Sequence, residues 1–180
     1  MAFSISDWIS KASLPTRSVV IFGRGDLVGE IEDLNRKLEV AEALEREDGT
    51  LAELSDANKI RQRLEEIWHE WNQSKTIWTV RALTTAETER IQAENPVPTD
   101  VKAEDYKTRA TAALELQGAS LIAQAVVSVR SFNEEARGPV SAQTILDLAQ
   151  AVGDLQVDRL ADAVKSAQAE NSAERIDAPK

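Results

Sequence analysis

The hydrophobic pattern changes its period within residues 14–38, and this change constrains the fold more than any other feature of the chain. Residues 18–22 are a compact run of β-branched and aromatic side chains, which is typical of a strand. From there the apolar positions lie alternately four and three residues apart, at Leu27, Ile31, Leu34, Leu38 and Ala41. Such spacing predicts an amphipathic helix. The segment therefore predicts a strand, a tight turn and a helix.

The turn has the sequence GRGD at residues 23–26. Gly23 and Gly25 permit a sharp reversal, because glycine adopts backbone angles that other residues avoid. Asp26 can accept hydrogen bonds from N–H groups in the first turn of the helix. We interpret these three residues as a structural turn. A dinucleotide-binding loop would need glycine where Val28 stands, and no alternation of strands and helices follows, so no cofactor is predicted.

A second helix is predicted from about residue 51 or 55 to near residue 72, because apolar residues again lie alternately four and three positions apart, at Ile60, Leu64, Ile67 and Trp71. We expect this row to pack against the stripe of the first helix in an antiparallel hairpin. Residues 75–83 alternate between apolar and polar side chains, which predicts a strand. A helical hairpin brings its two ends together. Residues 16–83 therefore predict a β-αα-β unit with two paired strands.

The rest of the chain is predicted to be helical. Thr84 and Glu87 match a capping box that opens a short helix ending before Asn95. Further helices are predicted over about 103–129, with a possible break at Gly118, and over 141–151 and 154–169. The fold class is thus mainly α, a helical hairpin with a small two-stranded β element followed by an α-helical half. The expected domains are residues 1–94, a proline-containing hinge at 95–100, a helical region at 101–170 and a flexible tail at 171–180.

Composition excludes several functional classes. The net charge of −10 opposes binding to the phosphate backbone of nucleic acid. Cysteine is absent and His69 is the sole histidine, so we expect no metal site, no catalytic constellation and no enzyme. No apolar stretch approaches the roughly 20 residues that cross a bilayer, and the first residues lack the features of a signal peptide. We expect a cytoplasmic protein that binds no membrane.

The four tryptophans suggest where a partner could bind. Trp71 and Trp78 fit the helix stripe and the strand pattern, which favours core packing. Trp68 lies off the stripe, so Trp68 and, at the start of the chain, Trp8 are candidate partner contacts. Aromatic residues make up only 4% of the chain. A core so poor in aromatics leaves apolar surface uncovered in a monomer, and we therefore expect self-association.

Three blocks of this sequence, in this order, resemble the tail assembly chaperones of long-tailed, siphovirus-type actinobacteriophages. The first block is LPTRSVVIFGRGDLVGEIEDLNRKL at residues 14–38, with an RGDL-type turn into a charged helix. The second is IWTVRALTTAETERIQAENPVP at residues 77–98, with an F/W-x-V/L-R-A-L signature. The third is LQVDRLADAVKSAQAEN at residues 155–171. The resemblance covers about residues 3–171.

The resemblance implies a role in virion assembly. Such chaperones coat the tape measure protein in the host cytoplasm, help to recruit tail tube protein, and are absent from the mature virion. In many phages a ribosomal frameshift adds an extension that recruits the tube protein. An alternative class for this chain is a helical structural or adaptor subunit that stays in a phage particle or another complex. The content of finished particles distinguishes the two classes.

Overall fold

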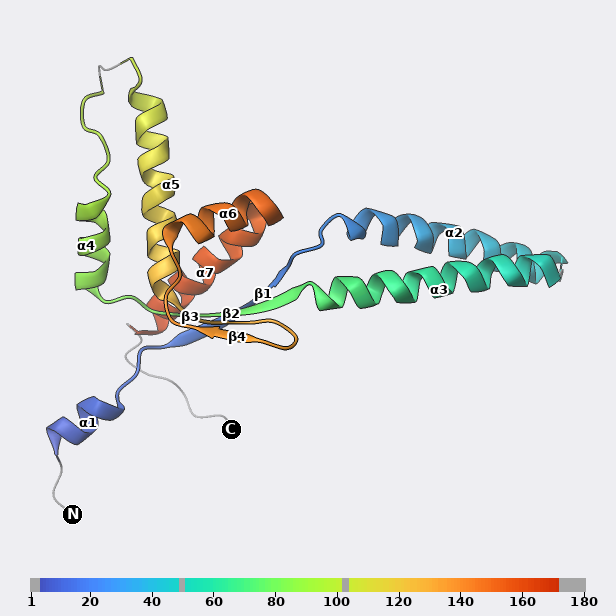
Figure 1. Cartoon of the computed structure of the whole chain (residues 1–180), viewed down its shortest axis with the longest axis horizontal. Helices are drawn as coiled ribbons and strands as arrows, with labels where there is room; N and C mark the ends of the chain where they lie inside the picture. The colour runs from blue at the N-terminus through green and yellow to red at the C-terminus, as the bar shows by residue number, and fades with distance from the viewer. Residues whose placement is uncertain (1–3, 49–50, 102–103, 172–180) are drawn as a thin grey trace. The chain divides into compact units, whose positions relative to one another are not determined.

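The computed structural model describes residues 4–48, 51–101 and 104–171. In these residues the chain is mainly helical, with seven helices and a small four-stranded antiparallel sheet (Figure 1). The chain divides into two compact units, which we describe separately. Unit 1 comprises Met1–Val19, Ile77–Val129 and Glu135–Lys180, and unit 2 comprises Val20–Thr76 and Arg130–Glu134.

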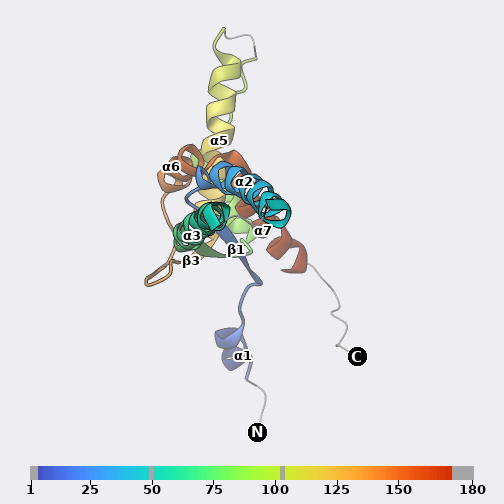
Figure 2. The same ribbon diagram turned by 90° about the vertical axis from the view of Figure 1, so that its right-hand side faces the viewer.

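Unit 2 is built around two long helices, α2 (Leu27–Asp48) and α3 (Leu51–Gln73), which lie side by side (Figures 1 and 2). Leu27, Ile31, Leu64 and Ile67 form its buried cluster, and Leu34, Leu38, Ile60 and Trp71 pack against them half-buried. This is the predicted contact between the two apolar rows, and it is confirmed. Ion pairs from Arg63 to Glu30 (3.0 Å) and from Arg61 to Glu42 (2.8 Å) link the two helices outside the core.

The sheet has the order β1-β2-β3-β4. Its strands are β1 (Thr16–Phe22), β2 (Lys75–Arg81), β3 (Val126–Arg130) and β4 (Glu135–Arg137). Two backbone bonds bracket the antiparallel pair of β1 and β2. The Gly23 N–H donates to the Ser74 carbonyl (3.2 Å), and the Ala82 N–H donates to the Pro15 carbonyl (2.9 Å). Both bonds give the same register, so the pairing contains no bulge.

The predicted two-stranded element was too small, because the prediction extended a helix over residues 126–129. The helix α5 (Tyr106–Ala125) runs unbroken through Gly118 and ends before Val126, where β3 begins. Three of the five β3 residues are valines, whose branched side chains favour an extended backbone. The Gly138 N–H donates to the Val127 carbonyl (2.8 Å), so pairing with the segment around β4 completes the change to strand.

The helices of unit 1 pack mainly through small residues. α5 contacts α4 (Thr85–Glu94), α6 (Ala142–Val152) and α7 (Asp154–Asn171), and α6 contacts α7. Ile91, Ile122, Ile145 and Leu160 are buried together with five alanines, namely Ala119, Ala123, Ala125, Ala163 and Ala167. Small side chains allow helices to approach closely but bury little apolar area each. The first helix, α1 (Ile5–Lys11), contributes no buried residue.

The capping box predicted at the start of α4 is confirmed. The Thr84 hydroxyl accepts a hydrogen bond from the Glu87 N–H (3.3 Å), and the Glu87 carboxylate accepts one from the Thr84 N–H (2.9 Å). The Asn95 N–H closes the helix on the Ile91 carbonyl (3.1 Å). The predicted limits of this helix therefore hold at both ends.

The predicted domain limits, including the hinge at residues 95–100, stay a prediction. Residues 172–180 of the predicted tail lie outside the described residues. Asn171, with which that segment was predicted to begin, is the last residue of α7.

Left-handed backbone angles occur in the described residues at Gly138 (φ 100°) and Gly153 (φ 86°). Gly153 also has ψ 154°, a combination that is essentially restricted to glycine. An added Cβ there meets no atom within 4 Å, so only the backbone opposes a side chain. We expect Gly153→Ala to lower the free energy of unfolding by about 1–3 kcal/mol, measured by urea denaturation.

Gly118 provides the matched control for this prediction. It lies inside α5, and an added Cβ at this position also meets no atom within 4 Å. Gly118→Ala should therefore raise the free energy of unfolding by roughly 0.5–1 kcal/mol, because alanine favours the helix. Equal effects from the two substitutions would contradict the role of the backbone at Gly153.

Candidate partner-binding surfaces

The turn at residues 23–26 is held to the end of α3. Besides the bond from the Gly23 N–H to the Ser74 carbonyl, the Arg24 N–H donates to the Ser74 hydroxyl (3.3 Å). The Arg24 guanidinium donates to the Asp26 carboxylate (2.8 and 2.9 Å) and lies 3.6 Å from the Glu70 carboxylate. The hydrogen bond from Arg24 lowers the pKa of Asp26. The arginine thus ties the turn to α3.

Two predictions about this turn were wrong in mechanism. Gly23 and Gly25 do not have positive φ, and a Cβ added at Gly25 meets no atom within 4 Å. Only Gly23 lies close to another chain segment, since its added Cβ would lie 3.4 Å from the Ser74 carbonyl oxygen. The Arg24 side chain donates to the Asp26 carboxylate, and no N–H group of the first turn of α2 does so within the described residues. A side-chain pair therefore replaces the predicted cap.

Trp68 belongs to a small aromatic cluster in unit 2. The ring of Phe22 stacks on Trp71, with centroids 4.0 Å apart and planes 4° apart. Trp68 meets Trp71 edge-on at 5.3 Å and 87°, yet remains 44% exposed. The Trp71 indole nitrogen is buried and donates to no acceptor within the described residues. Trp68 therefore presents an exposed aromatic surface that its own cluster holds in place.

Trp8 lies on α1, in unit 1, and is 62% exposed. Ile5 and Ile9 lie three residues before it and one residue after it, and both are similarly exposed. The spacing places all three on one face of the helix. The roles of Trp8 and Trp68 in binding a partner stay predictions, and the two residues belong to different units.

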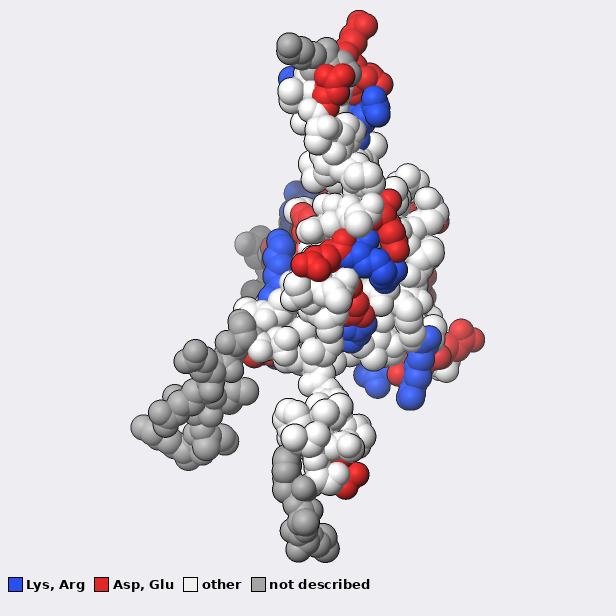
Figure 3. Space-filling view, turned by 90° about the vertical axis from the view of Figure 1, so that its left-hand side faces the viewer, with Lys and Arg blue, Asp and Glu red and all other residues white. Residues whose placement is uncertain are grey.

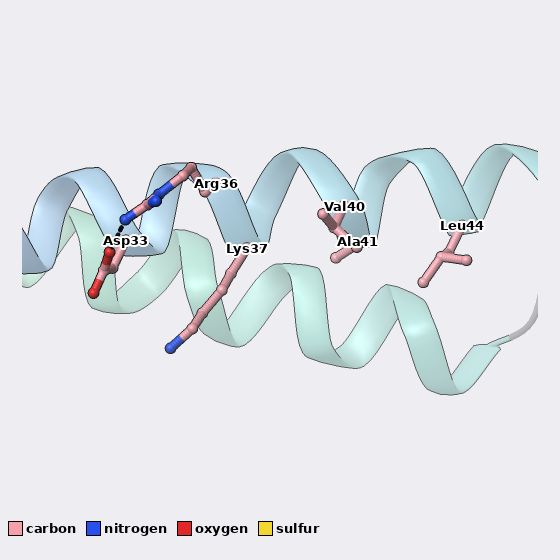
Figure 4. A pocket seen from close by; sticks show the side chains of 6 residues that line it. All are labelled: Asp33, Arg36, Lys37, Val40, Ala41 and Leu44. Carbon is pink, nitrogen blue, oxygen red and sulfur yellow. Dashed lines mark hydrogen bonds and ion pairs between the residues drawn. The ribbon is translucent and has the colours of Figure 1, made fainter.

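A shallow pocket of about 520 Å³ lies along α2, and sequence reasoning missed it (Figure 4). Val40, Ala41 and Leu44 form its apolar part, while Asp33, Arg36 and Lys37 line its other end. Asp33 and Arg36 form an ion pair with each other. Val40 is 61% exposed and Leu44 is 44% exposed, although both are large aliphatic residues. Their four-residue spacing beside the core stripe was the signal available in the sequence.

On the face drawn in Figure 3, acidic and basic side chains lie next to one another between uncharged areas. Among the described residues, no group of three or more His, Asp or Glu side chains is arranged to hold a metal ion. None of the described helices is both long enough and apolar enough to span a membrane.

Comparison with known proteins adds no relative. No family model matches the chain, and no curated protein or solved structure is significantly similar to it. Function must therefore be inferred from the residues and surfaces described above.

Proposed function

We propose that this chain is a phage tail assembly chaperone that coats the tape measure protein, helps to recruit tail tube subunits and leaves before the tail is complete. In this role it is not an enzyme and acts in the host cytoplasm. β1, α2, α3 and β2 act as one β-αα-β unit. Support for this unit comes from the adjacent strands and from the packed apolar rows of the two helices.

The observation that carries the proposal is the exposed apolar row on α2. Val40 and Leu44 are one helical turn apart and take no part in the buried cluster between α2 and α3. Two large aliphatic residues at this spacing suit the apolar face of another helix. A tape measure protein is long and helical, so it offers such faces repeatedly. The net charge of −10 keeps many copies soluble while they bind.

The pocket on α2 provides a direct test of this proposal. The double variant Val40→Gln, Leu44→Gln should bind a purified helical segment of the tape measure protein at least tenfold more weakly than the wild type. Two apolar anchors are removed, and about 1.4 kcal/mol of lost binding free energy corresponds to tenfold. Isothermal titration calorimetry measures the change. Both side chains are exposed, so the variant should keep the helical circular dichroism of the wild type.

Val28→Gln is the matched control, because Val28 is a 43% exposed valine on the same helix but outside the pocket. It should bind like the wild type. If Val28→Gln weakened binding of the tape measure segment as much as the double variant does, the loss of affinity would not be specific to the pocket.

Mass spectrometry of finished particles separates the two functional classes. A chaperone should be absent, whereas the alternative, a helical structural or adaptor subunit, should be present in stoichiometric amount.

A further inference from the structure

The two edges of the sheet differ in how they are protected from pairing with another strand. β4, at one edge, has three exposed residues, and two of them, Glu135 and Arg137, are charged. Short length and charge are the usual protection of an edge strand. β1, at the other edge, has seven residues and ends in four apolar ones. Its one charged residue, Arg17, is paired with Glu170 of α7. β1 therefore lacks both forms of protection.

The backbone bonds to β2 show which groups of β1 point outward. Gly23 and Pro15 are both bonded to the neighbouring chain segment, and they are an even number of residues apart. In an antiparallel pair, residues that bond to the neighbour alternate with residues whose backbone groups point away. The backbone N–H and C=O groups of the odd-numbered residues of β1 therefore point toward β2. The outward N–H and C=O groups belong to Thr16, Ser18, Val20 and Phe22, and no described strand lies beyond them.

We propose that the outer edge of β1 pairs with β1 of a second copy, in an antiparallel dimer whose two-fold axis passes beside Val19. In this register Ser18 pairs with Val20 of the partner subunit, and Thr16 pairs with Phe22 of the partner subunit. Each of the four outward residues then exchanges hydrogen bonds with a residue whose groups also point outward. A register shifted by one residue would place outward groups against inward ones.

The occupant is a second copy because β1 is complementary to itself. Val19 lies opposite Val19 of the partner subunit, and pairs of β-branched side chains stabilise neighbouring strands. Arg17 lies opposite Ile21 of the partner subunit, so no like charges face each other. A single pair of strands covers less area than a standard interface, so the dimer is weak and forms at high concentration.

Cysteine cross-linking tests this register directly. The chain contains no cysteine, so one engineered thiol reports one position. At the axis the two Cα atoms lie roughly 4.5 Å apart, as expected for a non-hydrogen-bonded pair, and a disulfide spans about 4.4–6.8 Å. Val19→Cys in the full chain should therefore form a covalent dimer in a glutathione redox buffer. Arg17→Cys, on the same face but away from the axis, should cross-link at least tenfold more slowly.

A proline variant gives an independent measurement. Ser18→Pro removes an outward N–H and leaves every backbone bond to β2 in place, which an edge strand tolerates. It also removes the exposed hydrogen bond between the Ser18 and Thr79 hydroxyls (3.2 Å), which Ser18→Ala removes without blocking the edge. Sedimentation equilibrium at high concentration should show dimers for the wild type and monomers for Ser18→Pro, with unchanged circular dichroism. Equal cross-linking rates for the two cysteine variants, or a wild type that stays monomeric, would overturn the proposed pairing. No tape measure protein is needed, so this outcome is separate from that of the proposed function.

Discussion

Replacing Ile67 with alanine should lower the free energy of unfolding by about 2–5 kcal/mol, the usual range for a truncated core aliphatic residue. Ile67 is fully buried between α2 and α3 and belongs to the cluster with Leu27, Ile31 and Leu64. Removing its side chain leaves a cavity between the two helices in addition to the lost apolar burial. Urea denaturation followed by helical circular dichroism measures the loss.

Val40→Ala is the control for this substitution, because Val40 is also aliphatic and also lies on the helical hairpin but is 61% exposed. It should change the free energy of unfolding by less than about 0.5 kcal/mol. A similar cost at both positions would mean that the hairpin has no defined core. No change at Ile67 would mean that α2 and α3 separate in solution and leave this face open to a partner.

Arg81→Ala should lower the free energy of unfolding by about 1–3 kcal/mol, because it leaves the half-buried Glu87 carboxylate without its main partner. Arg81 comes from the strand signature of the second resembling block. Its guanidinium forms two bonds to the Glu87 carboxylate, at 2.6 and 3.0 Å, and both side chains are about one quarter exposed, at 26% and 23%. Gln124 of α5 donates to the same carboxylate at 3.2 Å. The pair therefore joins β2, α4 and α5 within unit 1.

Arg90→Ala provides the comparison for Arg81→Ala. Arg90 pairs with Glu94 at 3.1 Å, but the two side chains are 53% and 56% exposed. Exposed pairs contribute little, so this substitution should change stability by less than about 0.5 kcal/mol. Thermal melts of both variants at neutral pH measure the difference. Arg90 also donates to Gln124 at 3.4 Å, so the two pairs differ mainly in exposure. Equal effects would show that partial burial does not strengthen the Arg81–Glu87 pair.

The Arg81–Glu87 pair should also make the free energy of unfolding decrease at acidic pH. Hydrogen bonds from the Arg81 side chain and from the Thr84 N–H hold the pKa of Glu87 well below its ordinary value of 4.5. As the pH falls below that value, Glu87 becomes protonated in the unfolded chain but stays ionised in the folded chain. The contribution of Glu87 is therefore complete above the ordinary pKa and is lost below it. Glu87→Gln should lose less stability between pH 7 and about pH 3 than the wild type.

Local sequence determined the parts of the fold that depend on residues within a few positions of each other. The four-three spacing predicted the apolar faces of α2 and α3 and their contact, because a helix repeats its faces every turn. The Thr84 and Glu87 capping box predicted the start of α4, because two residues three positions apart satisfy each other's backbone N–H groups at the first turn. Within each apolar face and within the capping box, the side chains that decide the structure are neighbours along the chain, whereas the contact between the two faces follows from the short connection between the helices.

Tertiary contacts decided what these patterns left open. Residues 126–130 became a strand, although the prediction extended a helix through most of them, because pairing satisfies backbone groups in a way that depends on chain far from them in sequence. Arg24 binds Asp26 and turns toward Glu70, which lies more than 40 positions along the chain, so the predicted helix cap did not form. Gly138 and Gly153, not Gly23 or Gly25, have the left-handed backbone, and at Gly153 the path between α6 and α7 requires it. Packing between distant segments also decides which aliphatic residues stay exposed and which edge of the sheet stays open. The hydrophobic periodicity of the sequence does not encode this packing.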